Sequence, residues 1–328
     1  EPWAKKFGGL VTADHMVSKG DADQGIDSEK FAMVILDHYT EWLETHATAD
    51  KTADEAAKAL EAFQGPRNTI KNMYTDNAPE LKKAIELLGI KHETSTPYRS
   101  PTNSKAERHN RLVLEGTRAL LEQSGFAAKW WPWAARHFCF SRNITMKDGD
   151  SAYNRRTGQG HFPGKRIPFG SLIDVQPPKP VLDKLPKFGK TTMPGIFLGY
   201  HVPNGGRWGG DYIVAPLHDF SKENKSNTVR VFRIKEVYQD TKQGVPFPLR
   251  KLKDATERTL RQDDHDYEKV EVQLDDGVET IELKDMDPYS VEILEQSLPP
   301  KGISPDDGDS DNIYEEDKRG RLRKRHKG

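Results

Sequence analysis

Short apolar runs and amphipathic segments alternate along the first third of the chain. The runs of the β type lie at residues 9–14, in the two halves of 30–46, at 69–76 and at 90–96. Two helical segments separate the later runs. One spans residues 48–63, and the other has Pro79 in its first turn and Gly89 past its end. This order of elements predicts an α/β fold built on a mixed five-stranded sheet with flanking helices.

A long polar helix follows, from Ser100 to the residue before Gly125. Because steps of three and four residues return to the same side of a helix, its residues divide between two faces. One face carries Ala106, Asn110, Val113, Thr117 and Leu120 or Leu121, and another carries Glu107, Arg111, Leu114 and Arg118. A further helix at residues 128–144 is rich in aromatic residues. We expect its Trp130, Trp131 and Trp133 to pack in the core rather than to stack on nucleic-acid bases.

The pattern changes beyond residue 147, where short β runs punctuated by Pro and Gly continue to about Tyr238. We therefore divide the chain into five parts. They are a linker at residues 1–8, a core domain at 9–146, a second linker at 147–165, a small antiparallel β-barrel (SH3-like) module at 166–245, and a tail at 246–328. The tail is acidic and then basic, and this composition favours disorder over most of its length.

Composition restricts the class of protein without identifying a partner. The 328 residues include 50 Lys and Arg against 51 Asp and Glu, so any attraction to a polyanion must come from local clusters. Cys139 is the single cysteine, which excludes an intrachain disulfide and favours an intracellular protein. No apolar run approaches the ~18 residues of a membrane span, and no membrane partner is expected. The chain begins without Met and is interpreted as a piece of a longer polyprotein.

Three acidic residues are positioned to form one site. Asp14 and Asp76 each end a β-type run, and Glu107 lies near the start of the helix that follows the last strand. We expect these side chains to converge at one edge of the sheet. Three carboxylates in one cleft repel one another unless a cation neutralises them, and hard oxygen ligands select Mg²⁺ or Mn²⁺. Two such ions about 3.5–4 Å apart can support an in-line phosphoryl transfer.

These residues resemble the catalytic core of copia-type retrotransposon integrases, within the retroviral integrase-like group of the RNase H-like superfamily. The segments that carry the resemblance are TDNAPEL, GIKHETSTPYRSPTNSKAERHNR and PGIFLGYHV, and it extends over about residues 9–238. It implies an RNase H-like core in which Asp14, Asp76 and Glu107 are the catalytic residues and hold two Mg²⁺ or Mn²⁺ ions. It also implies trimming of a cDNA 3′ end and its transfer into target DNA.

The chain departs from the family pattern in two ways. Thirty residues separate Asp76 and Glu107, which is fewer than the family usually has. Ala78 and Pro79 replace glycines after the second Asp, and Ser104 replaces one before the Glu, so the loops have less conformational freedom. Two other functions therefore remain open, an inactive nucleic-acid-binding relic of an integrase and an RNase H-type nuclease.

Each acidic residue also has a simpler interpretation. Asp14 can be a solvated or turn carboxylate paired with Lys19, and Asp23, Asp27 and Asp37 compete with it for the first ligand position. Asp76 can cap the following helix through an Asx-turn. Glu107 can form an i,i+4 ion pair with Arg111, worth a few tenths of a kcal/mol.

Nucleic-acid contacts are predicted at the start of the long helix. Phosphates need cations and amides there, and the candidates are Asn103, Lys105, Arg108, His109 and Arg111. His92 precedes the turn before this helix and can equally be a packed strand residue. The basic cluster at residues 319–327 is a candidate for nuclear import or for tethering nucleic acid. The resemblance implies the ends of the element's cDNA and target DNA as partners, a homo-oligomer, and a cytoplasmic particle and the nucleus as locations.

Overall fold

The computed structural model describes residues 5–20, 23–94, 103–177, 182, 187–221, 229–239, 242, 244–263, 269–274, 277–282, 314–316 and 322–324. Contacts within the chain divide it into two compact units. One consists of residues 1–250 and 312–328, and the other of residues 251–311. The two five-stranded sheets and the candidate site lie in the first unit, within residues 1–250.

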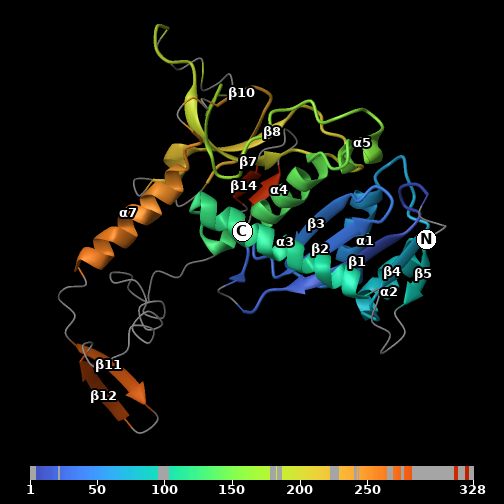
Figure 1. The fold of residues 1–328 in the computed structure, drawn as a ribbon, viewed down its shortest axis with the longest axis horizontal. Coiled ribbons are helices and arrows are strands. Elements are labelled where there is room, and N and C mark those ends of the chain that lie inside the picture. The colour runs from blue at the N-terminus through green and yellow to red at the C-terminus, as the bar shows by residue number, and fades with distance from the viewer. Residues whose placement is uncertain are drawn as a thin grey trace. The chain divides into compact units, whose positions relative to one another are not determined.

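The predicted mixed five-stranded sheet is confirmed (Figure 1). Its strands are β1 (Val11–Val17), β2 (Phe31–Asp37), β3 (Leu43–Thr48), β4 (Asn72–Thr75) and β5 (Lys91–Thr94), in the order β3-β2-β1-β4-β5. The three N-terminal strands pair antiparallel, whereas β1, β4 and β5 pair parallel. Asp14 differs from its expected place at a strand end, because β1 continues to Val17 through pairing with the first half of β2.

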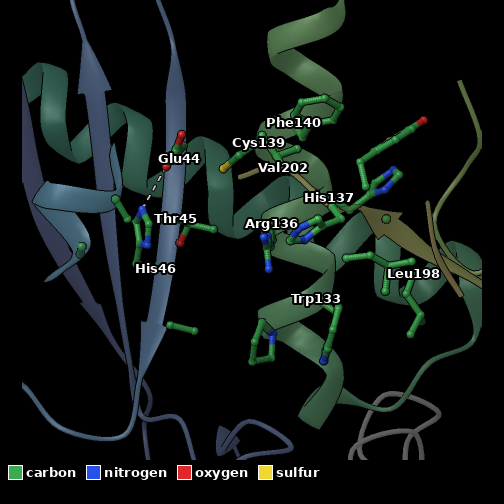
Figure 2. Close-up of a pocket in the computed structure, with 18 of the residues that line it drawn as sticks. Glu44, Thr45, His46, Trp133, Arg136, His137, Cys139, Phe140, Leu198 and Val202 are labelled. Atoms are coloured by element: carbon green, nitrogen blue, oxygen red, sulfur yellow. Dashed lines mark hydrogen bonds and ion pairs between the residues drawn. The ribbon is translucent and has the colours of Figure 1, made fainter. Parts of the chain in front are cut away.

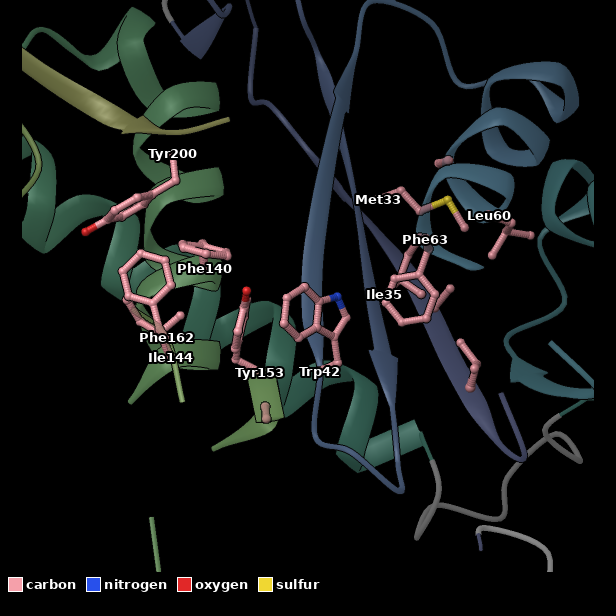
Figure 3. Close-up of a cluster of buried hydrophobic side chains, with 14 of the residues drawn as sticks. Met33, Ile35, Trp42, Leu60, Phe63, Phe140, Ile144, Tyr153, Phe162 and Tyr200 are labelled. Carbon is pink, nitrogen blue, oxygen red and sulfur yellow. The ribbon is translucent and has the colours of Figure 1, made fainter. Parts of the chain in front are cut away.

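Helices cover both faces of this sheet. They are α1 (Ala53–Gln64) and α2 (Pro79–Leu87) on one face, and α3 (Asn103–Ser124) and α4 (Trp131–Ile144) on the other. Successive side chains of β2 point to opposite faces of the sheet, and a hydrophobic cluster forms on each face. Met33 and Ile35 pack with α1 and α2 (Figure 3), while Val34 and Leu36 pack with α3 and α4. The result is a three-layer α/β/α arrangement.

The two predicted faces of α3 are observed. Val113 and Thr117 are buried on the inner face, and Asn110 is partly buried on it. Glu107 and Arg111 are exposed on the outer face. The inner face packs on β1 and β2, so α3 lies directly over the strand that carries Asp14.

A second sheet follows, in the order β10-β6-β7-β8-β9 and antiparallel throughout. Its strands are β6 (Leu172–Val175), β7 (Met193–Tyr200), β8 (Tyr212–Pro216), β9 (Phe232–Ile234) and β10 (Val237–Tyr238). No pairing joins β9 to β10 among the described strands, so the sheet is open and the predicted closed barrel is not observed. Closure needs edge strands that continue around the barrel, and β9 and β10 have only three and two residues.

The stretch predicted to be a linker, residues 147–165, is packed against both sheets. It contains α5 (Ala152–Thr157), which begins after the capping residue Ser151 and ends at Gly158 in the left-handed conformation. Tyr153 and Phe162 are buried in a cluster of rings that also includes Trp42, Phe140 and Tyr200 (Figure 3). The domain boundary at this stretch stays a prediction.

Part of the predicted tail has regular structure. It contains α7 (Pro248–Asp263) and two hairpins, β11 (Lys269–Leu274) with β12 (Gly277–Glu282) and β13 (Tyr314–Glu316) with β14 (Leu322–Lys324). The other predictions for residues 246–328 fall outside the described residues. Short 3₁₀ turns at Ala128–Trp130 and Leu217–Phe220 complete the elements. No helix in the described part of the chain is long and apolar enough to cross a membrane.

Candidate functional site

The parallel pairing of β1 with β4 aligns Asp14 with Asp76. Val11 lies opposite Met73 and Thr12 opposite Tyr74, so the same offset places Asp14 opposite Asp76, just beyond the paired residues. Residues aligned on neighbouring strands point to the same face of a sheet. The register therefore brings the first two predicted ligands to the same part of the sheet, although Asp14 lies within its strand and Asp76 follows the end of β4.

Two hydrogen bonds hold the Asp14 carboxylate. Its Oδ1 accepts from the backbone N of His15 at 2.7 Å, and its Oδ2 accepts from Asn110 Nδ2 at 2.8 Å. Asn110 comes from the inner face of α3, one turn after Glu107. Its own Oδ1 is buried without a hydrogen-bond partner among the described residues. The helix that carries Glu107 is thus tied to β1 at the candidate site.

The carboxylates of Asp76 and Glu107 both affect the pKa of Asp14. Burial raises this pKa, and the negative charges of Asp76 and then Glu107 raise it further. The hydrogen bond from His15 N and the charge of Lys51 act in the opposite direction, but the net result is a pKa above the ordinary value. Asp76 and Glu107 therefore both lie within electrostatic reach of Asp14.

The alternative role of Glu107, an ion pair with Arg111, is not observed. Arg111 Nε donates to Glu115 Oε1 at 2.7 Å, one turn further along α3, rather than to Glu107. Glu107 is exposed on the same helix. Its carboxylate is thus available to the site at the N-terminal end of α3.

The capping role of Asp76 is observed. Its Oδ1 accepts from the backbone N of Ala78 at 3.1 Å, which forms the Asx-turn that leads into α2. Pro79 occupies the first turn of that helix, where its missing N–H has no cost. One oxygen of Asp76 shapes the loop, and this role is compatible with a ligand role for the other.

Three charged or titratable neighbours were not predicted. Lys51 Nζ lies 2.6 Å from Glu80 Oε1, and His15 Nδ1 lies 3.8 Å from the same oxygen. Burial and the charge of Lys51 lower the pKa of His15, against the charges of Glu80 and Asp76. Lys51 follows β3 and Glu80 opens α2, so no sequence spacing indicated that they meet beside Asp14. Asn110, by contrast, had a usable signal, because it lies three residues after Glu107 on the inner face.

The donor atoms suit a hard divalent cation, but the side chains are not arranged around one. No three His, Cys, Asp or Glu side chains in the described ranges are grouped closely enough to hold a metal ion. Carboxylate oxygens are the ligands that Mg²⁺ and Mn²⁺ prefer, and the raised pKa of Asp14 shows that local positive charge would be stabilising. The Asn110 amide uses one lone pair of Asp14 Oδ2, and the carboxylate keeps others with which it could bind a cation.

The competing acidic residues have other surroundings. Asp37 is fully buried and accepts hydrogen bonds from Gly8 N, Thr40 N and Thr40 Oγ1, so it holds the turn after β2. Asp23 Oδ2 accepts from the backbone N of Lys19. Asp27 lies beside Glu29, and its backbone N donates to Glu29 Oε2. All three lack the alignment with Asp76 that Asp14 has.

The predicted nucleic-acid contacts are described in part. Arg108 and Arg111 are exposed on α3, and His109 is half-buried. The side chains of Asn103 and Lys105 lie outside the described residues. His92 on β5 packs within the sheet region, with its Nε2 2.8 Å from Thr75 Oγ1.

Comparisons with known proteins find a distant similarity and no matching family. No family model matches it. It is 27% identical over 115 residues to the Retrovirus-related Pol polyprotein from transposon RE2 of Arabidopsis thaliana. The aligned part covers 33% of this chain and 8% of that polyprotein, so the chain spans a small part of this relative. With the five-stranded mixed sheet, this similarity indicates a retrotransposon-related protein.

Proposed function

We propose that the chain is the integrase of a retrotransposon, a polynucleotidyl transferase that inserts the element's cDNA into target DNA. The alignment of Asp14 with Asp76, with Glu107 within electrostatic reach on α3, carries this proposal. Hydrolysis would trim the cDNA 3′ end. The freed 3′-hydroxyl would then attack a phosphodiester of the target.

The three carboxylates would hold the catalytic cations. Two Mg²⁺ or Mn²⁺ ions, when bound, would stabilise the charge that develops on the attacking and leaving oxygens. Asp14 would serve both ions, Asp76 one and Glu107 the other. Asn110 would orient the Asp14 carboxylate through its hydrogen bond to Oδ2. Arg108 and Arg111 would contact phosphates from the exposed face of α3.

A strand-transfer assay tests the proposal. The purified chain is incubated with a duplex oligonucleotide that has a recessed 3′ end, supercoiled plasmid as target, and Mg²⁺ or Mn²⁺. We expect joined product from the wild type and at least a ~100-fold loss in Glu107→Gln, since a metal-held carboxylate is removed. Glu115→Gln is the matched control, because Glu115 lies on the same exposed helix and pairs with Arg111.

Joining by Glu107→Gln at the rate of the control would exclude the assigned role of Glu107. Loss of joining in both variants would point instead to a general effect on α3. Thermal unfolding of each variant shows whether its fold is intact, so that a loss of joining can be assigned to chemistry.

A second function is an inactive nucleic-acid-binding relic of an integrase. The hydrogen bond from Asn110 to Asp14 favours it, because this amide uses one of the lone pairs with which the carboxylate could bind cations. Pro79 and the neighbouring Ala78 further restrict the loop that follows Asp76. Salt-dependent DNA binding without joined or trimmed product, in either metal, is the result expected of a relic.

A further inference from the structure

A cleft of about 590 Å³ lies at the free edge of the first sheet, away from the carboxylate site. β3 forms one side and α4 another, and Figure 2 shows Thr45 and Arg136 on these two elements. Residues of α1, including Lys58 and Ala59, also line it. The turn at residues 201–204 and the edge of the second sheet complete the walls.

The pairing of β3 with β2 determines which of its backbone groups face the cleft. Asp37 N donates to Trp42 O, which marks these two residues as a hydrogen-bonded pair. Such pairs recur at every second residue of an antiparallel ladder, so Glu44, His46 and Thr48 point their N–H and C=O groups toward β2. Leu43, Thr45 and Ala47 must therefore point theirs outward, toward the side that carries no strand.

One outward residue already has a partner that mimics a strand. Asn143 Oδ1 accepts from Leu43 N at 3.0 Å, and Asn143 Nδ2 donates to Leu43 O at 2.8 Å. This side-chain amide supplies the two bonds that a neighbouring strand would make. Among the described residues, no such bond reaches the outward groups of Thr45 or Ala47. Asn143 thus closes one end of the free edge and leaves the rest open.

The cleft has further polar groups that lack a hydrogen-bond partner among the described residues. Thr45 is buried, and its Oγ1 has no hydrogen-bond partner among the described residues. The same is true of Nδ1 of the buried His137, a residue of α4 that lines the cleft. Buried polar groups are almost always paired, so an edge of this kind is completed by a ligand or by water.

The alternation of donors and acceptors defines the class of ligand. Thr45 and Ala47 each present one N–H and one C=O, so an occupant must offer both acceptors and donors at strand spacing. A phosphodiester backbone offers only acceptors at its phosphates, whereas an extended peptide offers both. Strand addition to a sheet edge is a recurring way in which proteins bind peptides.

The charge at the open end of the cleft restricts the peptide further. Phe31 pairs with Thr48, so the preceding residues Asp27 and Glu29 lie near the end of β3, where both line the cleft. Removal from water and the charge of Glu29 raise the pKa of Asp27 to about 6. A basic side chain beside these two carboxylates would relieve their repulsion.

We propose that this cleft binds an extended peptide segment of a partner protein, which adds as a strand beside β3 and places a Lys or Arg near Asp27 and Glu29. Thr45 and Ala47 supply the backbone hydrogen bonds, and Arg136 lies beside the added strand on the α4 side. The peptide site does not depend on the carboxylate site or on its chemistry.

A library of random peptides displayed on phage, selected on the full chain, tests the proposal. The decisive variant is Ala47→Pro, because proline removes an outward N–H while leaving the inward bonds of His46 and Thr48 intact. We expect selected peptides that carry Lys or Arg near one end and bind Ala47→Pro at least ~10-fold more weakly than the wild type, the loss of about 1.4 kcal/mol.

Two further variants keep the test decisive if Ala47→Pro does not fold. Thr45→Val preserves shape but removes the unpartnered hydroxyl, and Glu29→Gln removes one carboxylate near the basic residue. Glu61→Gln, on the exposed side of α1 and outside the cleft, is the matched charge control. Chemical-shift changes at the Thr45 and Ala47 amides on titration of the strongest peptide would place it on the edge.

Selection of no peptide would overturn the proposal. So would peptides that bind wild type and Ala47→Pro equally, or peptides that lose affinity equally in Glu29→Gln and Glu61→Gln.

Discussion

The pKa of Asp14 gives a direct measure of whether the three predicted ligands converge. In the wild type this pKa lies above its ordinary value, because burial and the charges of Asp76 and Glu107 disfavour ionisation. Asp76→Asn removes the negative charge with the larger effect on this pKa, without changing the size of the side chain. We expect the pKa of Asp14 to fall in this variant, and to fall less in Glu107→Gln.

The alignment of the strands sets the size of the effect. Aligned side chains on neighbouring strands lie about 5 to 7 Å apart, so two unit charges at about 6 Å interact by about 0.7 kcal/mol in water and about 2.8 kcal/mol at an effective dielectric constant of 20. These energies correspond to about 0.5 and 2 pKa units. Asp14 and Asp76 are each partly exposed, so the lower half of this range is expected for Asp76→Asn.

Carboxyl resonances of ¹³C-labelled protein, followed from pH 2 to 8, supply the measurement, with Asp54→Asn on the exposed start of α1 as control. An unchanged Asp14 pKa in Asp76→Asn would refute the convergence of the two residues, whatever the activity of the chain.

The same shift has a consequence for stability. A raised folded-state pKa means that ionisation of Asp14 opposes folding, so this penalty is absent at low pH and appears as pH rises above the unfolded value. Asp14→Asn should therefore stabilise the protein at pH 7 and have less effect near pH 3. A destabilisation of equal size at both pH values would contradict this expectation.

Three further predictions concern buried groups. Asp37→Ala should lower the free energy of unfolding by about 3 to 5 kcal/mol in urea titrations, since it leaves Gly8 N and the Thr40 donors unpaired; a loss below about 1 kcal/mol would contradict this. Asn143→Leu should lower the free energy of unfolding by about 2 to 4 kcal/mol in the same titration, because the backbone N–H and C=O of the buried Leu43 both lose their partner. No change in this free energy would mean that water replaces the amide. Burial raises the pKa of Cys139, so its thiol should react with Ellman's reagent only after unfolding, and rapid reaction of the native protein would show that the site opens.

The order of elements in the first sheet was predictable because local signals agreed. Spaced alanines, a capping Thr52 and a terminal Gly65 define α1, and Pro79 marks the start of α2. The extent of β1 was not predictable. Asp14 and His15 interrupt its apolar pattern, and only the pairing with β2, a contact distant in sequence, extends the strand to Val17.

The acidic residues of the candidate site could be named from the sequence, and their role stays a prediction, whereas their polar surroundings could not be named. The spacing that brings Glu107 near the sheet also brings Asn110, whose side chain is held by Asp14. Lys51 meets Glu80 only because the loop after β3 and the start of α2 lie together in the fold. Helix α7 was missed for a different reason, because its many charges dominated the composition of the segment although residues such as Leu249 and Leu252 are good helix formers.

The second sheet was expected to be a separate module, joined by a linker in which proteolysis would occur between Lys147 and Lys165. The packing of that stretch leads to a different prediction. Arg156 Nη2 donates to Phe63 O and Gln64 O at the end of α1. Lys165 Nζ donates to Val237 O. A protease needs an extended, accessible backbone, and these contacts hold two of the tryptic residues of the stretch in place.

Trypsin should therefore cleave first elsewhere within residues 1–250. Among the described residues, the turn at 187–190 is the best candidate for first cleavage. Lys187 and Lys190 are exposed there, and Phe188 between them has 98% of its surface exposed. Mass spectrometry of the earliest fragments decides between the two expectations. First cleavage between Lys147 and Lys165 would show that this stretch opens independently and would support the separate module. Early cleavage at the turn, with residues 147–165 intact, would support one cooperative unit that includes both five-stranded sheets. Opening residues 147–165 would expose the core that Tyr153 and Phe162 share with both sheets, so it would require the whole unit to unfold.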